Sequence, residues 1–336
     1  MSKEQMFPNV LVTGGGGYVG SALVPALLKQ GHRVKVVDTF WYGENVFDDC
    51  NAHPALTRIP KDIRDTAAMK EAMRGVDAVI HLACISNDPS FELDPKLGKS
   101  INLDAFPGLL DAARANGVKR FIYASSSSVY GVKEQPDVRE SDPPDPLTDY
   151  SRFKLDCEHL LMEEKGKDMT RVIVRPATIC GYAPRLRLDL TVNILTIHAL
   201  VNRKIRIFGG KQMRPNLHVL DMVRAYEMFL SAPAEKIDGV PFNVGFENRM
   251  VEDIAKLVQR VLGDEGIALE YVPTDDNRSY HINSDRVRQV LGFAPKYTIE
   301  DAVRSLSEAY RAGRISDPMT NPMYQNIKRM RQMALG

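Results

Sequence analysis

A glycine-rich turn near the N-terminus places the strongest constraint on how this chain can fold. The apolar run Asn9 to Thr13 leads directly into Gly14-Gly15-Gly16-Gly17-Tyr18-Val19-Gly20, and a helix-like stretch follows. Glycine lets a backbone turn tightly and approach a diphosphate, which the N-terminus of the following helix stabilises. The order strand, turn, helix predicts a dinucleotide-binding unit. Its candidate cofactor residues are Gly14, Gly17, Tyr18, Val19 and Gly20.

Strand-like and helix-like segments alternate along the first part of the chain. The expected strands are residues 10–12, 34–37, 78–83, 120–124 and 171–175, and the expected helices are 18–30, 67–73, 99–116 and 150–165. Repeated strand–helix units of this length predict an α/β fold, a Rossmann-type doubly wound parallel sheet with helices on both faces. Beyond it, the sequence favours helices over 220–231 and 251–261 and a strand over 241–244.

The 336 residues suit one large α/β domain with an added lobe. We expect an NAD-binding domain over 7–180, to which 215–246 return. A smaller C-terminal substrate-binding lobe would comprise 181–214 and 247–315. The stretch 181–216, rich in Pro, Arg and Gly, is expected to be irregular, and the basic, Met-rich tail 316–336 to be a surface helix or arm without a binding role.

Composition excludes several other classes of protein. The net charge is +1, which gives no reason to expect a nucleic-acid or membrane partner. The four cysteines are widely spaced without a C-x-x-C, and the seven histidines form no H-x-x-x-H pair, so no metal site is expected. No apolar run reaches the ~18 residues of a membrane span, and no signal peptide is visible. A cytoplasmic location is the expectation.

Asp38 ends the second expected strand, 18 residues after Gly20. A carboxylate there accepts hydrogen bonds from the ribose hydroxyls of NAD and repels a 2′-phosphate. Asp62 and Ile63 stand where a third strand could meet the adenine. The cofactor prediction is therefore NAD.

Tyr150 and Lys154 are four residues apart, which places them on one face of a helix. Ionising a tyrosine at pH 7 from a pKa of ~10 costs ~4 kcal/mol. An ammonium at ~4 Å with an effective dielectric constant of ~20 returns about that much. The pair can thus supply a phenolate base. Tyr324 and Lys328 repeat the spacing, but without a serine cluster before them, and we interpret them as structural.

A run of four serines, Ser125 to Ser128, follows the strand that ends at Ala124. The carboxyl ends of strands are where α/β sites form, so a serine hydroxyl is expected beside Tyr150. Arg175, Arg214 and Arg278 come later in the chain and would suit a diphosphate. His81 ends an apolar strand and is interpreted as a core residue.

With these motifs together, residues 8 to 312 resemble the extended short-chain dehydrogenase/reductase family, in its nucleotide-sugar epimerase and dehydratase group. The motifs that carry the resemblance are Thr13 to Gly20, Asp62 to Asp65, His81-Leu82-Ala83, Asn102, Ser126, Tyr150, Lys154, Arg175, Arg214 to Asp221, Asn243-Val244-Gly245 and Leu291-Gly292-Phe293.

The resemblance implies roles for individual residues. Tyr150 and Ser126 would flank the sugar C4 hydroxyl, and Lys154 would also bind the nicotinamide ribose. The further cofactor residues it implies are Leu82, Ala83 and Asn102. Those implied for a nucleoside-diphosphate sugar are Ser86, Ser127, Thr178, Asn193 for the sugar nucleotide, Phe208 for the base, Arg214 and Arg278 for phosphate, and Arg185, with Arg187, for a substituent at C6.

One departure bears on the reaction. The 4,6-dehydratases of the resembling group have Asp-Glu after the catalytic Thr, and here those positions are Ser127 and Ser128. Elimination of water would lack its acid and base. The resemblance therefore favours an NAD-dependent 4-epimerase, with a 4-dehydrogenase, a 4-keto reductase or a 4,6-dehydratase as alternatives, and a non-catalytic NAD-binding protein as a minor one. It also implies a homodimer, formed through helices 99–116 and 150–165.

Overall fold

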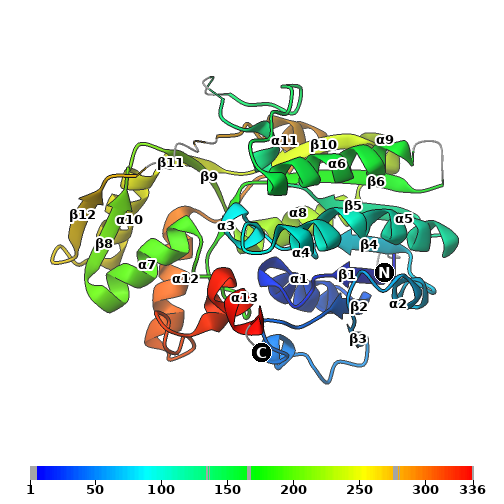
Figure 1. The fold of residues 1–336 in the computed structure, drawn as a ribbon, viewed down its shortest axis with the longest axis horizontal. Helices are drawn as coiled ribbons and strands as arrows, with labels where there is room; N and C mark the ends of the chain where they lie inside the picture. The colour runs from blue at the N-terminus through cyan, green and yellow to red at the C-terminus, as the bar shows by residue number, and fades with distance from the viewer. Residues whose placement is uncertain are drawn as a thin grey trace.

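The computed structural model describes residues 6–133, 135, 137–164, 168–274, 279 and 281–334. A parallel sheet of seven strands forms its centre, in the order β10-β6-β5-β4-β1-β2-β3 (Figure 1). The strands are β1 (Asn9–Thr13), β2 (Arg33–Asp38), β3 (Leu56–Pro60), β4 (Ala78–His81), β5 (Arg120–Ala124), β6 (Thr170–Pro176) and β10 (Val240–Val244). The predicted Rossmann-type fold is confirmed.

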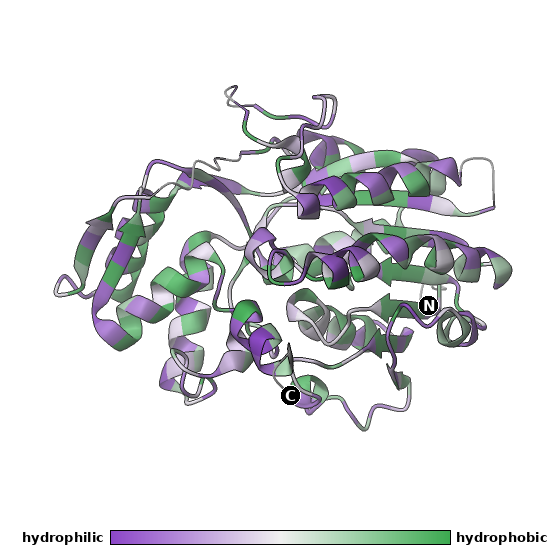
Figure 2. Cartoon of the chain, in the orientation of Figure 1, coloured by the Kyte–Doolittle hydropathy of each residue, from purple (hydrophilic) through white to green (hydrophobic). Residues whose placement is uncertain are grey.

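Helices cover both faces of this sheet because its strands are apolar on both sides. In β1, Val10 and Val12 belong to one core cluster and Leu11 to the other, as the alternation of side chains along a strand requires. Figure 2 shows the resulting hydrophobic sheet between helices with hydrophilic outer sides. One face carries α1 (Tyr18–Lys29) and α8 (Val219–Ser231), and the other α2 (Thr66–Ala72), α5 (Phe106–Ala115) and α6 (Asp149–Glu163).

The second lobe contains two smaller sheets. One joins β7 (Thr178–Cys180), β9 (Met213–His218) and β11 (Glu247–Met250), and the other pairs β8 (Lys204–Phe208) with β12 (Ala268–Val272). Helices α7 (Thr191–Asn202), α10 (Val251–Leu262) and α12 (Ile299–Arg311) pack together beside β8 around a third core cluster. The remaining short elements are η1 (Asn45–Phe47), α3 (Asp88–Phe91), α4 (Pro95–Lys99), η2 (Ser100–Asp104), η3 (Ser127–Tyr130), α9 (Ala234–Ile237), α11 (Asp285–Leu291), η4 (Pro322–Tyr324) and α13 (Asn326–Ala334).

Two expectations about secondary structure were wrong. Residues 181–216 are not irregular throughout, because they contain α7, β8 and most of β9. α7 is buried on several sides, so its sequence lacks the one-sided apolar pattern of a surface helix. The helix expected over 99–116 is divided into the π-helix η2 and α5, since Pro107 has no N–H to continue the hydrogen-bond ladder.

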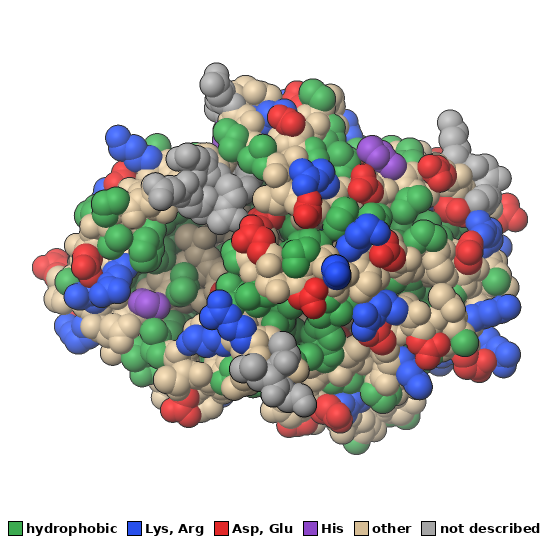
Figure 3. Space-filling view, in the orientation of Figure 1, with side chains coloured by type: hydrophobic (Ala, Val, Ile, Leu, Met, Phe, Trp, Pro, Cys, Tyr) green, Lys and Arg blue, Asp and Glu red, His purple; other side chains and the backbone are tan. Residues whose placement is uncertain are grey.

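Charged side chains do not gather into one field. Acidic and basic groups are interspersed over the face that Figure 3 shows. None of the helices in the described part of the chain combines the length and apolar character that a membrane span requires. Among the residues that the structure describes, no three His, Cys, Asp or Glu side chains are grouped as a metal site would need.

Candidate active site

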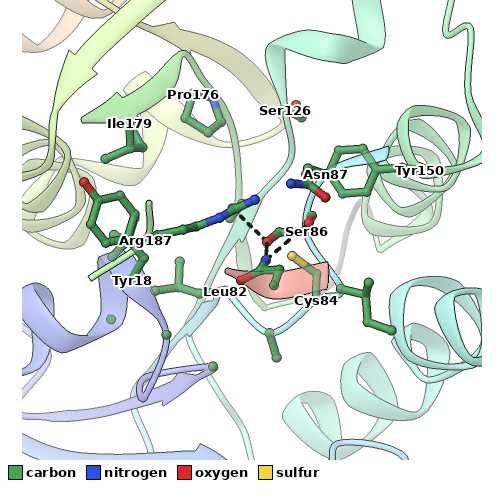
Figure 4. A pocket seen from close by; sticks show the side chains of 18 of the residues that line it. Tyr18, Leu82, Cys84, Ser86, Asn87, Ser126, Tyr150, Pro176, Ile179 and Arg187 are labelled. Carbon is green, nitrogen blue, oxygen red and sulfur yellow. Dashed lines mark hydrogen bonds between the residues drawn. The ribbon is translucent and has the colours of Figure 1, made fainter. Parts of the chain in front are cut away.

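A cavity of about 470 Å³ lies at the carboxyl ends of the sheet strands (Figure 4). Its walls come from the glycine-rich turn, the segments after β2, β4 and β5, the start of α6, and the chain after β6. The predicted site residues that line it are Gly14, Gly17, Tyr18, Val19, Gly20, Asp38, Asp62, Ile63, Leu82, Ala83, Ser86, Ser126, Ser127, Tyr150, Lys154, Thr178, Arg185 and Arg214. Residues from both expected domains therefore meet in one place.

Three predicted residues lie elsewhere, and Arg278 is outside the described residues. Asn102 is buried beneath the cavity wall, where its amide exchanges hydrogen bonds with the Ile85 backbone at 2.8 and 2.9 Å. Asn193 accepts from the Gly181 N–H (3.0 Å) and donates to Tyr18 Oη (3.0 Å), so its amide holds the turn after β7. Phe208 ends β8 and is 53% exposed, away from the cavity.

The glycine-rich turn has no room for a side chain at Gly14 or Gly20. Gly14 has φ +70°, and its N–H donates to the carbonyl of Val37 at 2.8 Å. A Cβ on Gly14 would lie 2.5 Å from the Ala83 nitrogen, and one on Gly20 would lie 2.4 Å from the Gly15 oxygen. Both approaches are closer than any real carbon contact. The backbone of the turn therefore packs directly against neighbouring backbone on one side. Its other side faces the cavity.

Asp38 is fixed by the turn that it faces. Its Oδ2 accepts from the Gly16 N–H (2.9 Å) and its Oδ1 from the Phe40 N–H (2.7 Å). Burial raises the pKa of this carboxyl, while those two backbone hydrogen bonds act in the opposite direction. Each carboxylate oxygen can accept more than one hydrogen bond, so Asp38 can still accept a hydrogen bond from a ligand hydroxyl.

Tyr150, Lys154 and Ser126 surround the opposite end of the cavity. Lys154 is buried; its Nζ donates to the Ala124 carbonyl (2.7 Å) and lies 5.9 Å from the centroid of the Tyr150 ring. An ammonium has three donors, so Lys154 can also bind a ligand hydroxyl. Ser126 Oγ lies 2.8 Å from Ser128 Oγ and caps η3 through the Ser128 N–H. Figure 4 shows Ser126 and Tyr150 on the same side of the cavity.

The buried position of the Tyr150 phenol opposes its ionisation. Burial raises its pKa above the ordinary value, and the charges of Cys84 and Asp88 act in the same direction. The Arg187 guanidinium and a hydrogen bond with Ser126 lower it by less. The expectation that Lys154 alone could supply a phenolate therefore omitted the cost of burying the ring. A further positive charge in the cavity would lower this pKa and favour the phenolate.

Arg175, one of the candidates for a diphosphate, does not line the cavity. It is buried behind the serine run, where its guanidinium contacts Glu158 at 2.6 and 3.0 Å. Its Nη1 donates to Tyr130 Oη (2.7 Å), and the Ser125 hydroxyl donates to Glu158 Oε1. This buried network positions the serine run from beneath.

Several other residues that line the cavity were not predicted from the sequence. Trp41 and Tyr42 follow β2, and the Arg185 guanidinium lies 3.8 Å from the centroid of the Tyr42 ring. This contact places Arg185 against the segment that contains Asp38, although the resemblance assigned it to the sugar. Asn87 has φ +74°, a backbone geometry that its residue type only weakly suggests. Asn326 comes from the C-terminal tail, where no binding role was expected.

Comparisons with known proteins give a consistent result. A family described as "NAD dependent epimerase/dehydratase family" matches residues 10–245. A UDP-glucose 4-epimerase of Rhizobium leguminosarum bv. trifolii is 27% identical, covering 88% of this chain and 95% of that protein. A dTDP-glucose 4,6-dehydratase of Streptomyces griseus is 29% identical (92% and 96%). An uncharacterized Sinorhizobium fredii protein is 36% identical over 51% of this chain and 41% of its own length.

Solved structures agree with the sequence comparison. The UDP-glucose 4-epimerase of Thermotoga maritima, crystallised with UDP-glucose, superimposes with a TM-score of 0.81 at 25% identity. The match covers 91% of this chain and 99% of that structure.

Proposed function

The chain belongs to the NAD dependent epimerase/dehydratase family, and on that premise we propose that it is a nucleotide-sugar 4-epimerase that works through a 4-keto sugar. The observation that carries the proposal is the composition of the cavity around Tyr150. Ser126, Ser127 and Ser128 line the cavity together with Tyr150, and Ser127 and Ser128 stand at the two positions where the resembling 4,6-dehydratases have Asp and Glu. Such a site can move a proton at a hydroxyl but is poorly equipped to eliminate water.

NAD is the cofactor of this family, and the cavity fits it. The backbone of the turn Gly14 to Gly20 would hold the diphosphate, Asp38 the adenosine ribose and Lys154 the nicotinamide ribose. When bound, NAD accepts and returns a hydride and brings a positive charge close to Tyr150. A positive charge there would lower the pKa of Tyr150, which burial has raised.

The protein's own groups would handle the proton. Tyr150 Oη would take it from the sugar C4 hydroxyl, and Ser126 would hold that hydroxyl in reach. After the keto sugar has rotated in the cavity, Tyr150 would give the proton back to the C4 oxygen while the hydride returns from the reduced cofactor to the opposite face of C4, and the product would be the C4 epimer. This step needs no other acid or base.

A 4,6-dehydratase is the second candidate, because one of the relatives bears that name and because of Asp88. Asp88 lines the cavity, and its charge acts on Tyr150. However, its Oδ1 already accepts from Thr148 Oγ1 at 2.5 Å, and elimination requires both an acid and a base. Asp189 also lines the cavity, but it accepts from Arg187 and Asn326. Carboxylates engaged in this way favour the epimerase.

The test is to incubate the protein with UDP-, GDP- and dTDP-sugars deuterated at C4 and follow the label by NMR. Deuterium retained at C4 with inverted configuration is the expected result. A released 4-keto sugar with stoichiometric NADH would replace the proposal by a dehydrogenase. A 6-deoxy-4-keto product would identify a dehydratase.

We also propose that the nucleotide-sugar enzyme is a homodimer. α5 and α6 lie on one face of the large sheet (Figure 1). Packing these two helices against their copies about a twofold axis would bury that face.

Asp38 should set the preference for NAD over NADP. Because a 2′-phosphate would lie beside its carboxylate, replacing Asp38 by alanine should narrow the ratio of the two dissociation constants by about tenfold. Calorimetric titration of the cofactor-free protein with each nucleotide measures this ratio. Asp48→Ala, an exposed acidic residue in the segment after β2, is the control. Tighter binding of NADP than of NAD by the unaltered protein would contradict the assignment.

A further inference from the structure

Asn326, the first residue of α13, reaches the cavity from the C-terminal tail. Within the described residues, it is the one lining residue that follows Tyr226 in the chain. It is 3% exposed, and it lies well beyond residue 245, where the match to the family ends. α13 packs against α3, and Arg329 donates to the Trp41 carbonyl at 2.5 Å. The tail is therefore attached to the rim of the cavity.

Asn326 joins two walls of the cavity through its own hydrogen bonds. Its backbone N–H donates to Asp189 Oδ2 (3.2 Å), and its Oδ1 accepts from Arg185 Nη2 (2.5 Å). Its Nδ2 donates to Ser86 Oγ (3.0 Å). Asp189 and Arg185 follow β7, whereas Ser86 follows β4. The Asn326 side chain thus connects the segment after β7 with the segment after β4.

The hydrogen bond to Ser86 decides which way that hydroxyl points. Ser86 Oγ accepts from Asn326 Nδ2 and also from Arg187 Nη1 (2.9 Å), an interaction marked in Figure 4. A hydroxyl has two acceptor lone pairs and one proton. With both lone pairs occupied, the Ser86 O–H remains as a donor, and Ser86 lines the cavity.

A second donor stands beside it. Arg187 is 8% exposed and lines the cavity; its Nε contacts Asp189 Oδ1 (2.6 Å), and its Nη1 is used by Ser86. Its Nη2 is buried and has no hydrogen-bond partner in the described structure. A buried, unpaired guanidinium nitrogen is costly unless a ligand completes it. The Ser86 hydroxyl and Arg187 Nη2 are therefore two hydrogen-bond donors that an anionic oxygen of a ligand could accept from.

We propose that Asn326 is a positioning residue that directs the Ser86 hydroxyl, next to Arg187, toward an anionic oxygen of the bound ligand. The proposal rests on the proposed function only for the origin of that oxygen. It belongs either to the diphosphate of NAD or to the nucleoside-diphosphate sugar. The tail beyond the family's common region is accordingly part of the binding site.

The decisive variant is Asn326→Asp, which has nearly the same shape. An aspartate still accepts from Arg185 but cannot donate to Ser86, so the Ser86 proton turns toward the new carboxylate and away from the ligand. Because a hydrogen bond to a charged group is lost, binding should weaken about tenfold or more. Titration of the cofactor-free protein with NAD, and of the NAD-loaded protein with UDP, GDP and dTDP, identifies which ligand carries the oxygen.

A double-mutant cycle separates positioning from a general structural effect. Ser86→Ala should weaken binding of the same ligand by a similar factor, and adding Asn326→Asp to it should then have a much smaller effect. Arg331→Ala, exposed on the same helix, is the control and should bind as the unaltered protein does. Since both readouts are binding constants, they stand even if the reaction is not an epimerisation.

Any one of three results would overturn the proposal. One is unchanged affinity for NAD and for all three nucleotides in Asn326→Asp. Another is unchanged affinity in Ser86→Ala, which decides the question even if the Asn326 variant fails to fold. The third is equal, additive losses from the two substitutions, which would assign Asn326 to the structure of the tail alone.

Discussion

Replacing Tyr150 by phenylalanine should lower kcat by at least ~100-fold while NAD remains bound. Loss of a positioned proton-transfer group typically costs 10²–10⁴-fold. The phenol lines the cavity beside Ser126, and phenylalanine keeps the ring that contacts its surroundings. The decrease should therefore appear in kcat, with the dissociation constant of NAD within about twofold of the original value. Single-turnover measurement of C4–deuterium transfer separates this effect from product release.

Tyr324→Phe is the matched control for that experiment. Tyr324 and Lys328 have the same spacing as Tyr150 and Lys154, but neither lines the cavity within the described structure. Tyr324 contributes its backbone carbonyl to the Leu188 N–H (2.8 Å), which phenylalanine preserves. Turnover should be unchanged. A Tyr150→Phe protein that turns over at the original rate would remove the tyrosine from the mechanism.

Replacing Glu158 by alanine should cost about 3–5 kcal/mol of the free energy of unfolding. Glu158 and Arg175 form an ion pair with side chains 4% and 5% exposed. Removing one partner leaves a buried guanidinium without its counter-charge, and this is far more destabilising than the net value of the pair. Urea unfolding at pH 7 with two-state extrapolation measures the loss.

Two further variants test the cause. Glu300→Ala breaks the exposed pair with Arg304, whose side chains are 39% and 55% exposed, and should change stability by less than ~1 kcal/mol. Replacing Glu158 and Arg175 together by Leu and Met should recover much of the loss, since no charge is then left unpaired. A loss below ~1 kcal/mol in Glu158→Ala would show that water or a rearranged partner compensates Arg175.

Local sequence patterns were sufficient to predict the central fold. The strands around Val10, Ile122 and Val172 are short apolar runs bounded by helices, and a parallel sheet with two covered faces requires this pattern. The strand Leu56–Pro60 was anticipated only through its end near Asp62 and Ile63, without bounds, because at the edge of the sheet it is only half buried and carries polar residues. α7 was missed for the opposite reason, since burial on several sides removes its periodicity.

Resemblance placed many candidate residues at the cavity, whereas a few of the others have partners elsewhere in the structure. The Asn193 amide is engaged by Gly181 and Tyr18, which its type and position could not reveal. Phe208 lies on a strand whose partner, β12, is distant in sequence. Asn326 and Ser86 are separated by 240 positions, and no local pattern connects them. Contacts of this kind depend on the tertiary fold alone.

The large sheet is closed at one edge by a strand that comes late in the chain. β10 pairs with β6, yet between them the chain leaves the sheet to form β7, α7, β8, β9 and α8. A chain cut after Cys180 would leave the β6 edge bare, with unpaired backbone groups. The sheet and the smaller lobe therefore share one cooperative unit and should melt in a single transition. A destabilising substitution in α10 or α12 of the smaller lobe would therefore lower the melting temperature of the large sheet by the same amount as that of the smaller lobe.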